Sequence, residues 1–459
     1  MNITLGRIAL ILPFFYFSFF ASAQNKENGV LISDFEYQKV EKRFFSVRGG
    51  TRILPQSHSL KEFAPKPLNQ FDYPTSPGWA ASYAALTIIE AQQTKRTGRD
   101  ITENAFSPIF PYYYSVNSTN NKECNKTVSI AQVLKAMKSY GTPRYVEFPV
   151  RCATHSPESK LNLAAKNRIS EYARLFDVGD SKEKKIIAIK TTLSENLPVV
   201  VASRVGKSFS YAKEFWQPRE SFSDDLPGQA LCVVGYDDTK YGGAFEVMNS
   251  RGVEWGNDGF MWIRYDDFIT YTKQAFSLYM IPPKNSVSQL SGGLELEMVA
   301  GGNMELVQLS PGYYKIKNSY PSGTQFKIKI INHSTGFLYV FASDLTNEIF
   351  ELFPPDLTSA AFSSEANFYV PDANTPIEID ETVGTDYLCV LFSKEDLDIS
   401  AIYQSIKTEK GTFKEKVHSA LKDKLVSPAE INFKFSEADF LVRETNKTVV
   451  ALIVEHDHR

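Results

Sequence analysis

The sequence predicts an α+β domain, with a helical lobe followed by an antiparallel β lobe, and then an all-β domain resembling a sandwich. Three observations support this order. Apolar residues recur at helical spacing before about residue 195, they alternate with polar residues from about residue 197, and short strands with turn signals fill the chain after about residue 300. A chain of 459 residues with 43% hydrophobic content can bury a core in each of two domains.

The N-terminal end has the pattern of a signal peptide over residues 1–23. Arg7 precedes an apolar run, Ile8 to Phe20, and Ala21-Ser22-Ala23 offers small residues for cleavage. The alternative is an uncleaved anchor, for which the run is short of the roughly 20 residues that span a bilayer. We therefore expect an exported protein in the periplasm, at the outer membrane or outside the cell, with no transmembrane segment after signal cleavage.

The charge balance argues against a nucleic-acid partner. The 50 basic and 53 acidic residues leave a formal net charge of -3, and no basic block stands out. The densest group of metal-ligand types, His456-Asp457-His458, lies at the chain end without a distant third ligand. We read it as a surface tail and predict no metal and no cofactor.

Export permits disulfides, and the chain has four cysteines. Cys124 and Cys152 lie in polar, loop-like sequence, which favours a disulfide between them; free thiols remain the alternative. Cys232 and Cys389 sit in apolar strand-like runs and are predicted to be small core residues.

Two helices are signalled clearly in the first half. Ser76 is predicted as the N-cap of a buried helix, because Pro77 suits the first helical position and apolar residues then follow at helical spacing. A second helix is predicted between Ser129 as cap and Gly141 as stop. Residues 161–195 are predicted as mostly helical, and residues 24–50 as a lead-in strand or linker.

Strand patterns follow in two groups. The β lobe is predicted to contain residues 197–202, 229–236, 244–249, 259–265 and 276–281. A Gly- and Pro-containing linker is predicted at 286–300. The last domain is predicted to contain strands at 326–331, 336–342, 349–353, 366–370, 377–380, 387–392, 431–435 and 449–454, with one charged helix at 411–425.

The loop before the first helix carries a resemblance to a known family. Asn69-Gln70-Phe71-Asp72-Tyr73-Pro74-Thr75-Ser76, followed by Trp79-Ala80, resembles the active-site segment of bacterial papain-like cysteine peptidases. The resemblance places Gln70 at the oxyanion-hole glutamine and Ser76 at the nucleophilic cysteine. Phe71 and Pro74 replace two glycines of that segment, which implies a remodelled cleft.

Two later motifs extend this resemblance. Gly228-Gln229-Ala230 resembles the strand that carries the general-base histidine, with Gln229 at its position. Met248-Asn249-Ser250-Arg251 and the Trp-Gly run after it resemble the segment with the orienting asparagine, kept as Asn249, while Arg251 replaces the tryptophan that covers it. The resemblance implies a papain-like domain over 51–285. The strands of 301–459 resemble a β-rich domain of unknown function found in exported bacterial proteins.

These replacements remove the chemistry that the family uses. A cysteine nucleophile works as a thiolate held by a neighbouring imidazolium, and neither partner is present. The Ser76 hydroxyl needs a base, and the amide of Gln229 cannot accept a proton at neutral pH. Gln70 and Asn249 are then expected to support the fold by hydrogen bonding rather than catalysis.

Two classes of function compete. The first is a pseudopeptidase that binds a peptide or protein partner in the bacterial cell envelope without cutting it. The second is a hydrolase that uses Ser76 with a displaced base, such as His58 or His155. A structural envelope protein without a ligand in the cleft is a third reading. The joint replacement of the cysteine, the histidine and the cleft residues favours the first.

Overall fold

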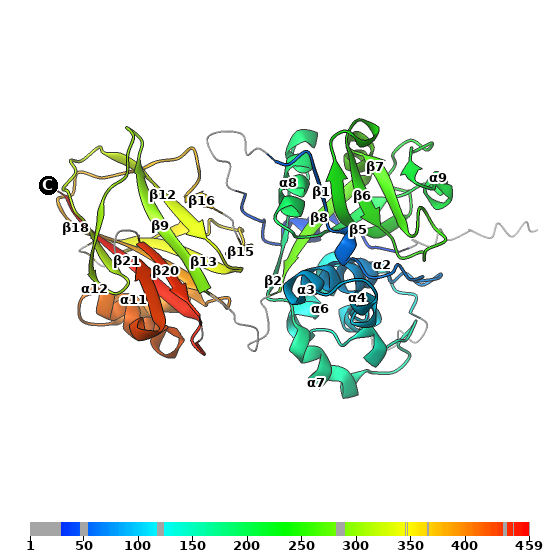
Figure 1. The fold of residues 1–459 in the computed structure, drawn as a ribbon, viewed down its shortest axis with the longest axis horizontal. Coiled ribbons are helices and arrows are strands. Elements are labelled where there is room, and N and C mark those ends of the chain that lie inside the picture. The colour runs from blue at the N-terminus through cyan, green and yellow to red at the C-terminus, as the bar shows by residue number, and fades with distance from the viewer. Residues whose placement is uncertain are drawn as a thin grey trace, which may run out of the picture.

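The computed structural model of the chain has two parts, which Figure 1 shows side by side. One part carries a sheet above a group of helices, and the other is built mainly of strands. The signal peptide predicted for residues 1–23 lies outside the described residues. The structure describes residues 29–45, 54–116, 124–280, 290–344, 346, 348–364, 367–434, 438–443 and 445–458.

A continuous helix runs through the centre of the first part. It consists of α2 (Ser76–Gly78), a π-helical stretch (Trp79–Leu86) and α3 (Thr87–Thr94). Every residue of the π-helical stretch is buried, so this helix has no solvent-facing side along that length. The predicted N-cap is wrong by one residue. Ser76 is the first helical residue and Thr75 takes the cap position, because the Ser76 hydroxyl is used by a neighbouring strand instead.

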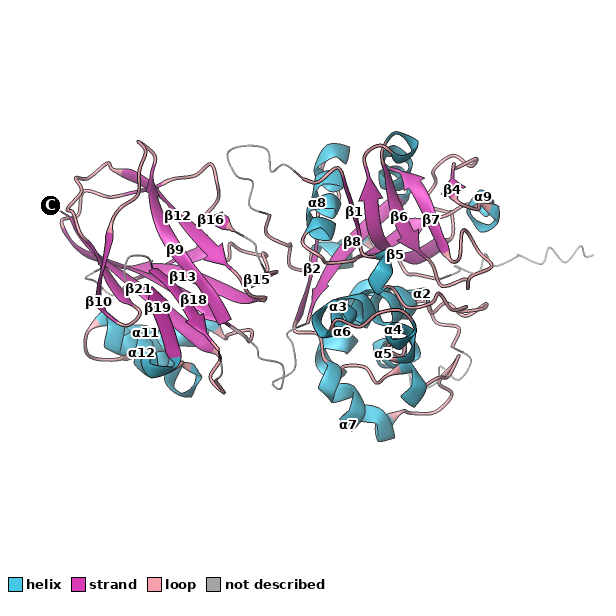
Figure 2. Ribbon diagram, in the orientation of Figure 1, coloured by secondary structure: helices cyan, strands magenta, loops and turns pink. Residues whose placement is uncertain are grey.

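The remaining helices of this part lie partly below the sheet and partly beside its strands (Figure 2). The helix predicted from Ser129 is confirmed as α6 (Ile130–Tyr140), where Ser129 and Gln132 form a reciprocal capping box and Gly141 ends the helix with a φ of 76°. The other helices of the first part are α4 (Arg99–Glu103), α5 (Ile109–Ser115), α7 (Leu161–Ala164), α8 (Lys182–Ser194), α9 (Lys207–Tyr211) and α10 (Tyr265–Tyr271).

The sheet of the first part has eight strands in the order β2-β8-β3-β5-β6-β7-β4, with β1 paired to β5. All its pairings are antiparallel except that of β4 with β7. The helical prediction for residues 161–195 is wrong at β2, because pairing with β8 overrides the local sequence preference there. The strands are β1 (Ser57–Ser59), β2 (Glu171–Arg174), β3 (Val199–Arg204), β4 (Phe215–Trp216), β5 (Gly228–Asp237), β6 (Ala244–Met248), β7 (Phe260–Arg264) and β8 (Thr272–Tyr279).

The second part is a sandwich of two sheets around its own apolar core, so the predicted fold class is confirmed. One sheet runs β10-β11-β21-β18-β13-β14 with β15 on β13, and the other runs β16-β12-β9-β20-β19 with β17 on β12. The strands are β9 (Leu290–Met298), β10 (Leu306–Ser310), β11 (Tyr313–Ile316), β12 (Gln325–Asn332), β13 (Gly336–Ser343), β14 (Ile349–Phe353), β15 (Ala361–Phe362), β16 (Phe368–Val370), β17 (Ile377–Glu378), β18 (Gly384–Ser393), β19 (Ile431–Lys434), β20 (Ala438–Val442) and β21 (Val449–His458).

Two predictions for this part need correction. The linker predicted at 286–300 is wrong over Leu290–Met298, because this stretch pairs with β12 and β20 as a central strand. Its glycines allow close approach of the neighbouring backbones, since a Cβ on Gly293 would lie 2.6 Å from the Ala438 carbonyl oxygen. The single charged helix is joined by a second one, α11 (Ile399–Thr408), packed against α12 (Phe413–Leu421).

The segment predicted as a lead-in strand or linker forms a short helix, α1 (Asp34–Gln38), and then joins the two parts. Tyr37 is buried and donates a hydrogen bond to the Ala275 carbonyl. Further on, Lys42 exchanges backbone hydrogen bonds with Leu357 and Ser359 of the sandwich. This segment is therefore held by both domains.

The disulfide predicted from the sequence is present between Cys124 and Cys152. It closes a loop across a sequence separation of 28. Chain-entropy arguments assign about 3–4 kcal/mol to a loop of this length. We expect the double variant Cys124→Ser/Cys152→Ser to lower the thermal unfolding midpoint, measured by circular dichroism. Reductant should lower the midpoint of the wild type only; an effect on the variant would contradict this origin.

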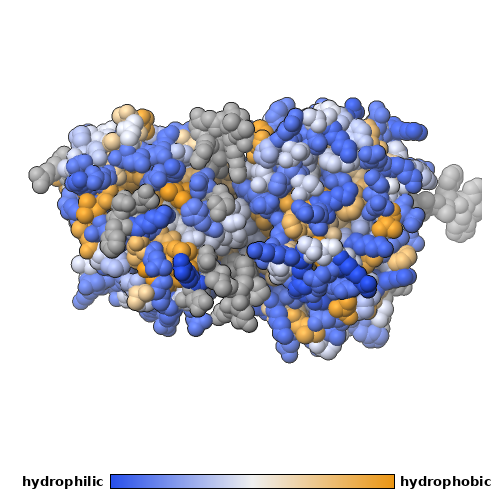
Figure 3. Space-filling view, in the orientation of Figure 1, coloured by the Kyte–Doolittle hydropathy of each residue, from blue (hydrophilic) through white to orange (hydrophobic). Residues whose placement is uncertain are grey.

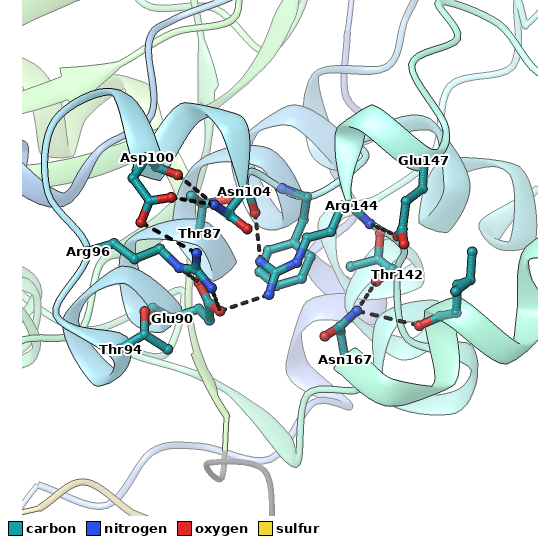
Figure 4. A network of polar contacts seen from close by, with 12 residues as sticks. Thr87, Glu90, Thr94, Arg96, Asp100, Asn104, Thr142, Arg144, Glu147 and Asn167 are labelled. Carbon is teal, nitrogen blue, oxygen red and sulfur yellow. Dashed lines mark hydrogen bonds and ion pairs between the residues drawn. The ribbon is translucent and has the colours of Figure 1, made fainter. Parts of the chain in front are cut away.

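A buried charge network ties the central helix to its neighbours (Figure 4). The Glu90 side chain is 6% exposed and accepts from Arg96 at 3.2 Å and from Arg144 at 2.8 Å. We expect Glu90→Gln to lower the free energy of unfolding by about 2–3 kcal/mol, because it leaves both guanidinium groups without their shared carboxylate. Urea unfolding measures this. The exposed pair Arg99–Glu103 provides the control, since Glu103→Gln should change the value by less than about 0.5 kcal/mol.

The surface shows no dominant apolar face in the view of Figure 3, where hydrophilic residues prevail on both domains and apolar ones lie in small groups. No helix among the described residues is both long enough and apolar enough to cross a membrane.

Candidate functional site

The start of the central helix meets the sheet at Ser76. Ser76 is fully buried, and its Oγ accepts a hydrogen bond of 3.1 Å from the backbone N–H of Ala230 on β5. Among the described residues, no titratable side chain hydrogen-bonds to this hydroxyl. The Ser76 oxygen therefore serves as an acceptor that links the helix start to the strand.

The side chain of Gln229, one residue before Ala230, is the centre of an amide network. Its Nε2 donates to Asn249 Oδ1 at 2.9 Å and to Gln70 Oε1 at 3.2 Å. Gln70 Oε1 also accepts from the Ser250 hydroxyl at 2.5 Å, and Gln70 Nε2 donates to the Tyr73 carbonyl at 2.8 Å. The structure thus brings together the four residues singled out from sequence, and none of their side chains titrates near neutral pH.

Asn249 is held rigidly within this network. Its Oδ1 also accepts from the backbone N–H of Ser250 at 2.8 Å, and the residue is 2% exposed. Its Nδ2 is buried and has no hydrogen-bond partner among the described residues. A buried donor without a partner costs about 1–3 kcal/mol, so this position is not optimised for stability alone.

The backbone at Gly29 covers the Ser76–Gln229 pair. Gly29 has a φ of 122°, and a Cβ built on it would lie 2.9 Å from both Ser76 Oγ and Gln229 Oε1. Only glycine fits there. The next residue, Val30, is buried, and Leu31 donates a backbone hydrogen bond to Val128. The N-terminal segment therefore passes directly over the position of the nucleophile.

Sequence reasoning missed this contact. Gly29 stands in a charged, irregular stretch that the sequence assigned to a lead-in. The apolar pair Val30-Leu31 directly after it was the available signal. No local sequence pattern links Gly29 to Ser76, because the two residues are 47 positions apart (76 minus 29) and meet only in the folded chain.

An open cavity of about 480 Å³ remains beside Gly29. Its wall includes both glutamines of the network. Other lining residues include Gly29, Phe71, Asp72, Ser210, Arg251 and Glu254. Burial lowers the pKa of the Arg251 guanidinium from its usual value, an effect that the nearby Asp72 carboxylate opposes. The site is thus a polar pocket with one half-buried cation.

Part of this arrangement lies in a stretch that matches a known family. Residues 110–278 match the model of the papain family cysteine proteases, and the matched stretch includes Gln229 and Asn249. The first domain is papain-like. The match begins after Ser76 and Gln70, so their assignment in this papain-like domain rests on the quoted motif and on the contacts above. Residues 319–396 match a domain of unknown function (DUF4384) within the sandwich.

Several solved structures are similar to part of this chain. Xylellain, a cysteine protease from Xylella fastidiosa, is 20% identical, with a TM-score of 0.43, over 56% of this chain and 97% of that one. Digestive procathepsin L 3 of Tenebrio molitor is 16% identical, with a TM-score of 0.42, over 54% and 80%. The bromelain protease from Ananas comosus is 16% identical, with a TM-score of 0.39, over 50% and 100%. No curated protein matches this chain.

Phe71, which stands at a glycine of the resembling family segment, lines the cavity. Phe71 keeps a left-handed backbone with a φ of 57°, which costs a non-glycine residue about 1–2 kcal/mol. The residue is 45% exposed and lines the cavity, and the guanidinium of Arg151 lies 3.9 Å from the ring centroid. The replacement therefore adds an aromatic group to the rim while the glycine-like backbone is retained.

The two histidines considered as substitute bases lie elsewhere in the papain-like domain. His58 on β1 pairs with Tyr236, seven residues along β5 from Gln229, or about 23 Å of strand. Its ring hydrogen-bonds to Asn196 Oδ1. His155 is exposed and hydrogen-bonds to its neighbour Thr154, whereas Ser76 is fully buried. Neither histidine contacts Ser76.

The described residues offer no group of three His, Cys, Asp or Glu side chains placed to hold a metal ion. The two cysteines outside the disulfide, Cys232 and Cys389, are buried in the cores, and burial raises the pKa of each thiol. They are therefore poor nucleophiles and poor metal ligands.

Proposed function

We propose that this chain is an exported papain-like pseudopeptidase that binds a peptide or protein partner of the cell envelope in the cavity beside Ser76 and does not cut it. One observation carries the proposal. Gln229, Asn249 and Gln70 form a buried amide network, and Ser76 is buried beside it with its hydroxyl bound to the Ala230 backbone. This group has no titratable base and lies under the Gly29 backbone, while a cavity stays open next to it.

This network lacks the general base that hydrolysis by a serine requires. A serine hydroxyl attacks a carbonyl only with the help of a base, and general-base assistance is typically worth about 10²–10⁴ in rate. Gln229 is a donor to two amide oxygens and cannot take the proton. An approaching carbonyl would also collide with Gly29.

Export is supported by two independent features. The first 23 residues have the composition of a signal peptide. The disulfide between Cys124 and Cys152 suits an oxidising compartment.

Two assays on the mature protein test this proposal. In the first, a peptide library is incubated with the wild type and with Ser76→Ala, and mass spectrometry is expected to find no cleavage by either. In the second, binding of labelled peptides is measured for the wild type and for Ser210→Trp, which places an indole at the exposed cavity wall. Binding lost in Ser210→Trp supports the proposal. Ser76-dependent cleavage, or the absence of any cavity-dependent binding, would overturn it.

A further inference from the structure

Arg251, a lining residue of the cavity without an ion-pair partner, indicates which class of ligand binds there. This inference rests on the proposed function. We infer that the cavity recognises the free C-terminal carboxylate of a peptide, and that Arg251 is the residue that binds it. The inference depends on three features of the described residues. Arg251 has no ion-pair partner, the Gly29 backbone blocks the space over Ser76 and Gln229, and the other charged side chains that line the cavity are acidic.

Arg251 is half-buried and unpaired. Among the described residues, no carboxylate lies within 4.0 Å of its guanidinium, and the guanidinium makes no hydrogen bond. Its backbone is held on both sides, because Gln70 N–H donates to the Ser250 carbonyl at 2.8 Å and Gly252 N–H donates to the Leu68 carbonyl at 3.1 Å. A partly desolvated guanidinium without an ion-pair or hydrogen-bond partner is costly, and its planar fork fits a carboxylate.

The backbone at Gly29 closes the side of the cavity that faces Ser76 and Gln229. An open papain-like cleft lets a peptide run past the nucleophile in both directions, but here the backbone at Gly29 fills the space above Ser76 and Gln229. Val30 next to it is 1% exposed, so the chain is packed into this position. A ligand in the cavity cannot continue over Ser76 and Gln229, because the Gly29 backbone occupies that space. This block favours a ligand that ends in the cavity, such as a chain terminus, over an internal loop.

The acidic side chains that line the cavity favour a ligand with a single carboxylate over one with several acidic residues. Asp72 and Glu254 also line the cavity and are exposed to solvent. Acidic residues that precede the terminus would meet these carboxylates and be repelled. The exposed ring of Phe71 offers apolar contact to such residues instead. Strained backbone at a non-glycine residue, as at Phe71, is typical of ligand sites.

Paired peptides with free and amidated C-termini provide the test. Fluorescence anisotropy measures their binding to the mature wild-type protein, to Arg251→Gln and to Arg251→Lys. We expect amidation to weaken binding by about 10- to 100-fold, the range for a charge-assisted hydrogen-bond pair. Arg251→Gln should cause a similar loss and should abolish the difference between free and amidated peptides. Arg251→Lys should retain part of the affinity, because the charge stays and the fork is lost.

Controls separate this inference from the proposed function. Arg99→Gln removes an exposed arginine on α4 and should leave binding unchanged. Far-UV circular dichroism and thermal midpoints verify that each variant is folded. Equal binding of amidated peptides, equal binding of end-blocked peptides with internal acids, or full affinity of Arg251→Gln would overturn the inference. If Ser210→Trp still abolished binding in those cases, the proposed function would stand. If none of the peptides showed binding that depends on the cavity, both the inference and the proposed function would be overturned.

Discussion

Replacing Glu195 by alanine is expected to lower the free energy of unfolding by about 3–5 kcal/mol, the range for breaking a buried ion pair. The Glu195 carboxylate pairs with Arg43 of the N-terminal segment, and their side chains are 7% and 4% exposed. The carboxylate also accepts from the Ser363 hydroxyl of the sandwich at 2.6 Å. Glu195→Ala therefore leaves a buried guanidinium unpaired at the junction of the two domains. Urea unfolding monitored by tryptophan fluorescence measures the loss.

Two further variants test this origin of the effect. Glu183→Ala removes an exposed carboxylate at the start of α8, the helix that ends just before Glu195, and should lower the unfolding free energy far less than Glu195→Ala does. The double variant Arg43→Met/Glu195→Leu replaces the pair with apolar groups and should recover most of the stability. If Glu195→Ala proved neutral, or the double variant were as unstable as the single one, the buried pair would not be what joins the segment to the domains.

The local signals in the sequence predicted much of the fold. The cap at Ser129 and the stop at Gly141 bound α6 correctly, because helix ends are decided by neighbouring residues. Alternation over residues 229–236 and 244–249 similarly marked β5 and β6. The strand β9 was missed because it contains two glycines and its partners β12 and β20 lie far along the chain. Tertiary pairing, rather than local preference, makes it a strand.

The sequence predicted which polar residues form the candidate site, but it did not predict that the Gly29 backbone lies over them. The motif resemblance predicted that Ser76, Gln229, Asn249 and Gln70 lie close together. The contacts of the central helix and β5 show this proximity. The sequence predicted a cleft remodelled at Phe71 and Pro74, and Phe71 lines the open cavity together with Arg251. The closure comes from Gly29, which contacts the site only through the tertiary fold.

Restoring the family's residues at the two altered positions is expected to give almost no peptidase activity. The double variant Ser76→Cys/Gln229→His supplies a thiol at the start of the central helix and an imidazole within reach of Asn249 Oδ1. The thiolate can then form, but the substrate carbonyl still cannot approach because the Gly29 backbone lies over both positions. Misplacement by about 1 Å already costs about 10²-fold in rate. We therefore expect turnover of fluorogenic peptides at least about 10²-fold below that of an active papain-like peptidase assayed alongside.

A second readout separates the state of the thiol from access to it. The pH dependence of alkylation by iodoacetamide, compared between Ser76→Cys alone and the double variant, reports whether the imidazole lowers the pKa of the introduced thiol. A lowered pKa without peptide turnover would place the defect in substrate access, as the Gly29 cover predicts. Turnover near that of the active peptidase would mean that the N-terminal segment leaves the cleft readily. Peptides could then run through the site, and the argument that a ligand ends in the cavity would fail with it.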